Sequence, residues 1–351
     1  MTVPVAPADP VGVLSGPIDP EPMRRAVVRH DAAEAVRIVE HLLDGGRTTL
    51  DVLEMIAALQ REVGARWERG EWTVTQEHRA TGIAALAVEA VAAHVRSAPV
   101  TRGRVVVACA EREWHGLAHT LVATALRSDG WDVTALGASS SLHRFGRALR
   151  DLDPDVTALS CSLLRSLPSA RSFIRASAAA GVPLLAGGAA FGLDASRALR
   201  LGATAWAPDA RGAVDRLTRP LVADTDARPT KPGTSAALHE WATLDRTHRV
   251  RAEVLRGRWA QRATAPEPVL AGAVVEELLG GVLATLVSDD RTVLTQAVAW
   301  CQRILEARGA TNDLAALRTM IASELRDYPV ACDVVTDDRA WSGCGVGSMG
   351  K

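Results

Sequence analysis

Residues 113–118 read Glu-Trp-His-Gly-Leu-Ala, and this stretch decides the fold predicted around it. A strand-like run at 105–109 precedes it, and a helical run at 117–127 follows. A histidine at such a turn lies at the carboxyl edge of a parallel sheet, where open α/β sheets bind their ligands. Glu113 can hydrogen-bond one ring nitrogen of His115 and leave the other for a metal. The alternative is a solvated turn histidine beside an ordinary acid, because short motifs often match by chance.

Small residues stand at the ends of two later strand-like runs. Ser160 and Ser162 follow one buried run, and forty-one residues separate Ala118 from Ser160. Gly187 and Gly188 follow the next apolar run. Because glycine lets another group approach the backbone closely, these positions predict space for a ligand along the same edge of the sheet.

This order of residues resembles the cobalamin-binding domain of methionine synthase, methylmalonyl-CoA mutase and their relatives. The family pattern is Asp-x-His-x-x-Gly, then about forty residues, then Ser-x-Leu, and then Gly-Gly. The chain departs from it at three positions, where Glu113 replaces Asp, Ala118 replaces Gly and Ser162 replaces Leu. The resemblance covers roughly residues 102–220 and implies that His115 is the lower axial ligand of cobalt.

The residue types suit a corrinoid whose nucleotide tail is displaced from cobalt. A neutral imidazole supplies one axial nitrogen, and the displaced dimethylbenzimidazole needs a deep slot lined by small residues. The residues that meet this need are Ser160, Ser162, Gly187 and Gly188. Ala118 adds one methyl group where the tail would pass, and Gly137 begins another small polar surface at the ligand edge.

Residues 21–97 are predicted to form an antiparallel four-helix bundle. An amphipathic helix is expected at 31–43, and either Thr49 or Asp51 is the expected N-cap of the next helix. Thr75 is the expected N-cap of the last helix.

A second pattern lies in this bundle, where nine residues separate Trp67 from Glu77-His78. It resembles the helical domain of CarH-type adenosylcobalamin photoreceptors, and the resemblance implies that Trp67 covers the adenosyl group while Glu77 and His78 contact it. Those receptors carry a histidine after the tryptophan, whereas this chain carries Glu68. The alternative is Trp67 as a core anchor and Glu77 as a favourable first-turn acid.

The composition argues against several classes of protein. The 351 residues include 40 Lys and Arg against 41 Asp and Glu, which does not favour nucleic acid or an anionic membrane as partner. The five cysteines show neither a metal-binding spacing nor a disulfide framework, which favours a reducing cytoplasm. We find no signal-peptide pattern and no uncharged apolar run of about 18 residues, so no membrane span is expected.

The rest of the chain divides by periodicity and composition. Strands alternate with helices over 102–221, which predicts a doubly wound, Rossmann-like parallel sheet. The strands are expected at 104–109, 132–136, 156–160, 183–186 and 203–207. A proline-containing linker at 222–234 leads to an all-helical domain at 235–330. Residues 1–20 are predicted to be a disordered tail and residues 331–351 a partly ordered one.

The first helix of the third domain is rich in arginine and also carries tryptophan and histidine. The simpler interpretation is a solvated face with tryptophan in the core. The sharper one is a pocket for a flat dianion, in which aromatic rings stack and arginines clamp two carboxylates. The candidate contacts are His239, Trp241, His248, Arg251 and Arg258. Cys301 lies on an apolar helical face, which is more typical of a buried residue than of a pigment attachment site.

The order of the three domains resembles the photocobilins, in which a globin-like domain holds biliverdin beside cobalamin. The favoured function is therefore a light sensor that binds adenosylcobalamin and biliverdin, without catalysis of its own. Its output is expected to be a light-dependent change of homo-oligomer, or an effector or enzyme partner. The alternative is a corrinoid carrier for methyl transfer, which leaves residues 235–330 without a role. A mutase subunit would need a radical barrel of about 250 residues, for which the chain has no room.

Overall fold

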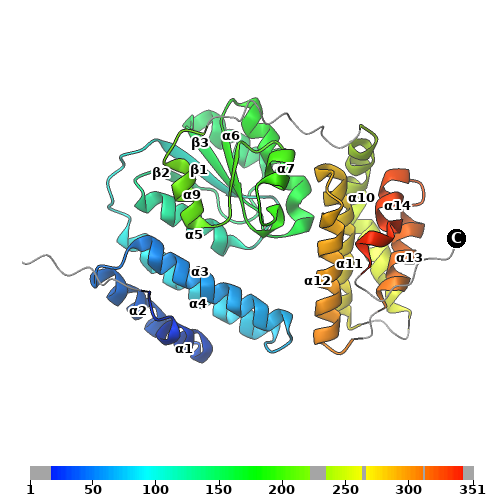
Figure 1. Cartoon of the computed structure of the whole chain (residues 1–351), viewed down its shortest axis with the longest axis horizontal. Coiled ribbons are helices and arrows are strands. Elements are labelled where there is room, and N and C mark those ends of the chain that lie inside the picture. The colour runs from blue at the N-terminus through cyan, green and yellow to red at the C-terminus, as the bar shows by residue number, and fades with distance from the viewer. Residues whose placement is uncertain (1–16, 222–234, 263–265, 311–312, 343–351) are drawn as a thin grey trace, which may run out of the picture.

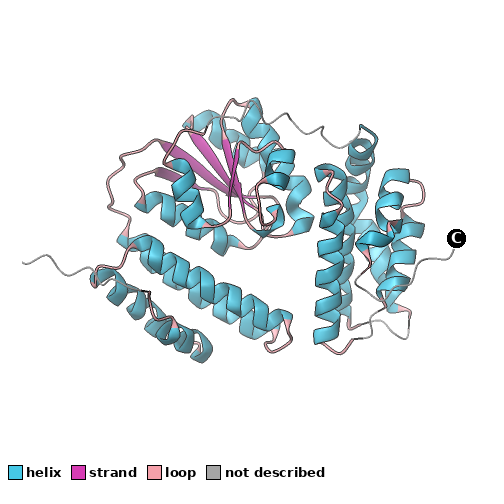
Figure 2. Cartoon of the chain, in the orientation of Figure 1, coloured by secondary structure: helices cyan, strands magenta, loops and turns pink. Residues whose placement is uncertain are grey.

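The computed structural model of the chain consists of three packed units (Figure 1). It describes residues 17–221, 235–262, 266–310 and 313–342. A helical bundle comes first, followed by a sheet flanked by helices and then by a second helical unit. Figure 2 shows all the strands in the middle unit. The predicted order of a helical bundle, a Rossmann-like domain and a helical domain is therefore confirmed, whereas the globin-like character of the last unit stays a prediction.

The first unit contains four helices that pack on one another and on the sheet domain. They are α1 (Glu21–Arg29), α2 (Ala32–Asp44), α3 (Thr49–Glu68) and α4 (Val74–His94). The predicted caps were one to three residues too late, because Thr48 caps α3 and Thr73 caps α4. Thr73 forms a capping box with Gln76, so both the side chain and the backbone of the cap residue are hydrogen-bonded.

The second unit is a five-stranded parallel sheet with the strand order β2-β1-β3-β4-β5. The strands are β1 (Arg104–Cys109), β2 (Asp132–Ala135), β3 (Val156–Ser160), β4 (Leu184–Gly187) and β5 (Ala205–Ala207), close to the predicted positions. The chain order reverses between β1 and β3, and doubly wound sheets bind ligands at such a switch point. The loops that follow these two strands carry His115 and Ser162.

Helices cover both faces of the sheet, since alternate strand residues point to opposite sides. Val105 and Val107 share a core with α5 (Gly116–Ser128), α9 (Ala210–Leu217) and the bundle. Val106 and Ala108 face α6 (Leu142–Leu152) and α7 (Leu167–Ala179). The bundle therefore lies on the side of the sheet that α5 and α9 cover.

The third unit is helical and extends beyond its predicted end. Its helices are α10 (Ser235–Ala260), α11 (Pro268–Ser288), α12 (Thr292–Ala307), α13 (Leu314–Glu324) and α14 (Pro329–Thr336). The tail predicted at 331–351 is wrong for the part up to residue 342, because Val335 and Trp341 are buried in the core of this unit. The Trp341 indole nitrogen donates to the Val335 carbonyl at 2.9 Å. The predicted linker and the predicted tail at 1–16 lie outside the described residues.

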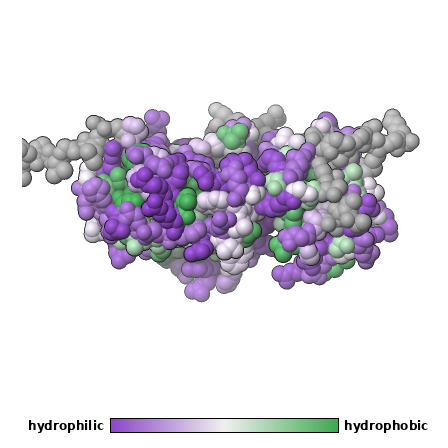
Figure 3. All heavy atoms as spheres, turned by 90° about the horizontal axis from the view of Figure 1, so that it is seen from below, coloured by the Kyte–Doolittle hydropathy of each residue, from purple (hydrophilic) through white to green (hydrophobic). Residues whose placement is uncertain are grey.

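Helix α11 is apolar along almost its full length. By length and composition it could cross a membrane, with a mean hydropathy of 1.8, but 78% of that window is buried inside the protein. Its apolar character is thus accounted for by its position at the centre of a helical core. Seen from below, the surface of the molecule is mostly hydrophilic, with small and separate hydrophobic patches (Figure 3).

The third unit is joined to the sheet domain by a common core and by a buried ion pair. Val287 and Val293 pack in the same core as Phe173 of α7. Arg197, on α8 (Ser196–Arg200), donates to Asp290 in the turn between α11 and α12 at 3.0 Å. Both side chains are buried, so the turn between the two helices is fixed to the sheet domain.

Candidate functional site

His115 is held in one orientation by the buried carboxylate of Glu113. The imidazole Nδ1 donates to Glu113 Oε1 at 2.6 Å, and the backbone N–H of His115 donates to the same oxygen at 2.9 Å. Glu113 Oε2 accepts the backbone N–H groups of Ser162 and Leu163 at 2.7 and 2.9 Å. The carboxylate is fully buried, whereas the imidazole is 60% exposed. This geometry leaves Nε2 of His115 available at the edge of the sheet.

Glu113 and His115 each stabilise the charged form of the other. Burial opposes ionisation of Glu113, but hydrogen bonds from His115 and Leu163 hold its pKa below the usual range. The bond to Glu113 raises the pKa of His115, although burial acts against it. Glu113 therefore remains a carboxylate that fixes the ring and makes Nε2 more basic, as acids behind metal-binding histidines do.

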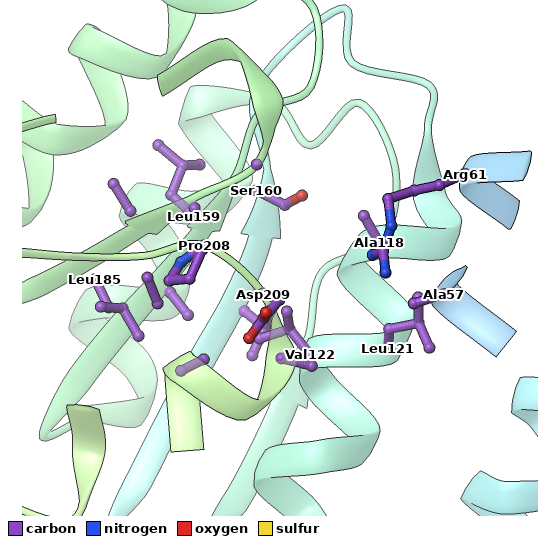
Figure 4. A pocket seen from close by; sticks show the side chains of 18 residues that line it. Ala57, Arg61, Ala118, Leu121, Val122, Leu159, Ser160, Leu185, Pro208 and Asp209 are labelled. Carbon is purple, nitrogen blue, oxygen red and sulfur yellow. The ribbon is translucent and has the colours of Figure 1, made fainter. Parts of the chain in front are cut away.

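A cavity of about 150 Å³ lies between the sheet and helices α3, α5 and α9, and Ala118, three residues after His115, lines it. Its walls are mostly apolar and include Ala118, Ser160, Gly187 and Gly188, four of the residues predicted to line a slot. Figure 4 shows Arg61 extending from α3 at the mouth, with Pro208 and Asp209 on the far side. Prediction from sequence missed these three residues, because they come from a helix and a strand-to-helix loop outside the motif.

The backbone at Gly188 is shaped as only glycine allows. Its φ is +103°, and a Cβ atom there would clash with the backbone of Cys161 in the loop after β3. The loops after β3 and β4 therefore close on each other at the cavity wall. Ser162 and Gly137 do not line the cavity: Ser162 acts through its backbone N–H on Glu113, and Gly137 accepts a hydrogen bond from Ser140.

Comparison with known proteins agrees with this geometry. Residues 103–217 match the family described as a B12 binding domain, and residues 21–92 match a second B12 binding domain family. The chain carries a cobalamin-binding module. The residues fit the cofactor, because a corrin ring surrounds its own cobalt and needs one protein nitrogen from below. In the described part of the chain no three His, Cys, Asp or Glu side chains group around a common point, so a lone His115 fits a metal that arrives in its own ring.

The proteins similar to this chain include a transcriptional repressor and a corrinoid protein. Over 141 residues it is 34% identical to the HTH-type transcriptional repressor CarH of Myxococcus xanthus. That region is 39% of this chain and 46% of CarH, so the chain spans about half the length of this curated relative. The fold is similar to that of the monomethylamine corrinoid protein of Methanosarcina barkeri, with a TM-score of 0.50 and 20% identity. The likeness covers 56% of this chain and 94% of the corrinoid protein.

Trp67, predicted to cover the upper face of cobalamin, packs on the third unit. Its ring lies 6.2 Å from the ring of Trp300 on α12, and the Arg308 guanidinium stands 4.9 Å from it. Trp67 is thus a core anchor at the end of α3, as in the alternative interpretation. Glu68, at the position of the receptor histidine, faces Arg303 at 3.8 Å.

Glu77 and His78 lie in the first turn of α4, as predicted, but they differ in exposure. Glu77 is largely buried and accepts a hydrogen bond from Thr81 at 2.7 Å. The Glu77 carboxylate is close enough to His115 to raise its pKa, although less than Glu113 does. His78 is 74% exposed. Of this pair, Glu77 is the more buried residue and bonds within α4, whereas His78 faces outward.

The five residues predicted to contact a bilin do not form one group. Arg251 and Arg258 both turn to Glu324, at 2.7 and 3.6 Å, so they stabilise α10 against α13. His239 is exposed, and Trp241 is half-buried between the third unit and the sheet domain. Only His248 lines a cavity. Cys301 is buried, as predicted, with its thiol 3.8 Å from the Val274 carbonyl.

The cavity at His248 has a volume of about 490 Å³ and lies between α10, α11 and the loops of the sheet domain. It is lined by Arg112, Arg165, Asp245, Arg246, His248, Arg249, Glu276 and Leu283. Its polar contacts are long: the Arg112–Asp245 ion pair measures 3.7 Å, and His248 Nε2 lies 3.7 Å from the Glu276 carboxylate. Burial lowers the pKa of His248, which keeps that ring neutral near pH 7.

Proposed function

We propose that the chain is a light sensor that binds adenosylcobalamin and has no catalysis of its own. The observation that carries the proposal is the Glu113–His115 pair, which presents one basic nitrogen beside a narrow slot. Similarity to CarH, a repressor by its name, favours a regulator over a methyl carrier.

Different residues would bind the cobalt and the nucleotide tail of the cofactor. His115 would hold cobalt from below through Nε2, with Glu113 keeping the ring in place. Ser160, Gly187 and Gly188 would line the slot for the displaced nucleotide tail. Bound adenosylcobalamin supplies a cobalt–carbon bond that visible light breaks. Glu77, whose charge acts on His115, would contact the group on the other side of the ring.

The signal would be a movement of the bundle. Helices α3 and α4 would pack differently against the edge of the sheet with an adenosyl group between them than without one. We propose that this changes a cytoplasmic homo-oligomer, or the binding of an effector or enzyme partner. Neither nucleic acid nor membrane is part of the proposal.

The second candidate is a corrinoid carrier for methyl transfer. The specific observation in its favour is that Trp67 packs on Trp300, leaving less side-chain surface for an adenosyl group. A carrier would bind methylcobalamin and adenosylcobalamin alike.

We also propose that the chain binds biliverdin, in the cavity at His248 and not at Arg251 and Arg258. Arg251 and Arg258 are engaged by Glu324, whereas Arg246 and Arg249 line the cavity. Two propionates could pair with such arginines, and a neutral imidazole could stack on or bond the pigment. The walls of this cavity come from two units, so the complete chain is the form that would bind.

The proposal is tested by spectroscopy of the full chain with each pigment. Purified protein mixed with adenosylcobalamin in the dark should give a spectrum without dimethylbenzimidazole coordination, and green light should convert it irreversibly. Biliverdin should add a red absorption band that acid denaturation removes. Equal binding of methylcobalamin with no light-driven change of assembly would favour the carrier, and absence of the red band would end the bilin proposal alone.

A further inference from the structure

Trp67 is held by the third unit from two directions. The Trp300 ring packs on it at 6.2 Å with an interplanar angle of 34°. Arg308, next to the end of α12, places its guanidinium 4.9 Å from the ring centre and donates to the Trp67 carbonyl at 3.2 Å. A cation over an indole face is the strongest of the cation–π pairings. These contacts fix both the ring and the backbone of Trp67.

The turn between α3 and α4 fits closely against the same end of α12. A Cβ atom on Gly70 would lie 2.6 Å from the Ala307 carbonyl oxygen, so only glycine allows this approach. Glu68 faces Arg303 one turn earlier on α12. In Figure 1 the lower end of α12 stands beside this turn.

The partner helix α11 contacts the support of His115. A Cβ atom on Gly280 would clash with Arg165, which lies in the short helix η1 (Leu164–Ser166). The buried carboxyl of Glu277 is 3.8 Å from the same arginine. The residues just before η1 are Ser162 and Leu163, whose N–H groups hold Glu113.

The hairpin of α11 and α12 therefore contacts both the end of the bundle and the loop that holds Glu113. Its turn is fixed to the sheet domain by the buried pair of Arg197 and Asp290. Trp67 cannot follow a movement of the bundle without losing Trp300 and Arg308. An anchored hairpin of this kind sets the distance between the α3–α4 turn of the bundle and the sheet edge that carries His115.

We propose that Arg308 and Trp300 are positioning residues for Trp67, so that the third unit sets which upper ligand the cobalamin site accepts. This inference rests on the proposed function, because it assumes that the upper group lies between the bundle and His115. Adenosyl is bulky and methyl is small. A bundle held at a fixed distance from His115 leaves room that suits one upper ligand better than the other, whereas a mobile bundle can pack on adenosyl and methyl alike.

The test compares adenosylcobalamin and methylcobalamin binding to the full chain in the dark. In Arg308→Ala the preference for adenosylcobalamin should fall about fivefold, the size expected of one cation–π contact. Methylcobalamin affinity and the lower-ligand spectrum should stay unchanged. Arg308→Lys keeps a cation over the ring and should recover most of the preference. Gln302→Ala is the matched control, because Gln302 lies on α12 but bonds Glu306, away from Trp67.

Two results overturn the inference. One is an unchanged preference in Arg308→Ala when the wild-type chain prefers adenosylcobalamin. The other is an equal loss of affinity for both cobalamins with a lower melting temperature, which means that Arg308 only stabilises the fold. Should Arg308→Ala not fold, Arg308→Lys and Trp300→Phe carry the same comparison. A wild-type chain that binds neither cobalamin contradicts the proposed function itself, so the two failures are distinguishable.

Discussion

At the scale of single residues, the site depends on one carboxylate that serves four partners. Glu113 accepts the backbone N–H groups of His115, Ser162 and Leu163 and the imidazole of His115. The part of this arrangement within two residues could be predicted from the sequence, because Glu113 and His115 share one turn. The part that reaches Ser162 could not, since it depends on two loops forty-nine residues apart meeting at the sheet edge.

Glu113→Gln should weaken cobalamin binding by about 10- to 100-fold, the usual cost of losing a partner behind a metal ligand. An amide has one acceptor oxygen, so its NH₂ group would face either His115 or the N–H groups of the loop after β3. Titration of the variant with cobalamin measures the effect. Glu111→Gln, an exposed acid in the same loop, is the control and should bind like the wild type. Full affinity in Glu113→Gln would mean that the carboxylate does not orient His115.

Gly188→Ala should destabilise the fold by about 2 kcal/mol or more, because a non-glycine residue at this positive φ is strained and the added methyl group would meet Cys161. It should also lower cobalamin affinity by narrowing the slot. Chemical denaturation measures the first effect. Gly64→Ala is the control: Gly64 is within α3, with no neighbour near the added atom, and the change should stabilise by about 0.5–1 kcal/mol. A stable Gly188→Ala would contradict the described closure of the two loops.

At the scale of elements, the strands were easier to predict than the ends of helices. Strand β1 lies where expected because five consecutive buried residues leave little ambiguity. The last helix was missed because glycine, serine and aspartate are frequent near the end of the chain. Its signal was nevertheless present, as Pro329 in the first turn is followed by apolar residues at helical spacing. The docking of Trp67 on α12 had no local signal, since its partners are more than 200 positions away in sequence.

The junction between α8 and the α11–α12 turn makes stability depend on pH. Burial opposes ionisation of Asp290, but bonds from Thr292 and Arg197 hold its pKa below the usual value. A lowered pKa contributes stability above the unfolded value of about 3.9, and that contribution is lost as pH falls through the folded pKa. Unfolding curves between pH 7 and 3 should show this loss in the wild-type chain and a smaller one in Asp290→Ala.

Asp290→Ala should also cost about 3–5 kcal/mol at pH 7, because it leaves Arg197 buried without its carboxylate. Asp289→Asn is the matched control, because Asp289 is exposed and in a left-handed conformation that asparagine tolerates. If both variants unfold alike, the buried pair does not hold the third unit on the sheet domain.

At the scale of the whole molecule, two units form the cobalamin-binding module, and the third unit contacts both of them. The module could be predicted from the sequence because its motif residues follow predicted strands, and the carboxyl ends of parallel strands meet at one edge of the sheet. The third unit gave no equally sharp pattern, and four of its five candidate pigment residues turn out to lie outside the cavity at His248. The positions of these four residues depend on packing between helices that are distant in sequence, and this packing cannot be predicted from composition alone.

The full chain loaded with adenosylcobalamin should change its assembly when illuminated, because loss of the adenosyl group frees the bundle to move. Size-exclusion chromatography with light scattering, in the dark and after green light, measures this directly. Methylcobalamin-loaded protein is the control, because illumination heats and photolyses it in the same way without releasing an adenosyl group. An unchanged mass and elution volume after complete photolysis would argue against a sensor that signals through assembly.

The central claim is that His115 provides the axial nitrogen, and the absorption spectrum of bound cobalamin tests it most directly. The wild-type chain should show a cobalt coordinated by imidazole with the nucleotide tail displaced. His115→Ala should keep its circular dichroism and melting temperature, because the ring is largely exposed, while its cobalamin binds more weakly or shows the base-off spectrum. His115→Ala that binds cobalamin with the wild-type affinity and spectrum would contradict the account.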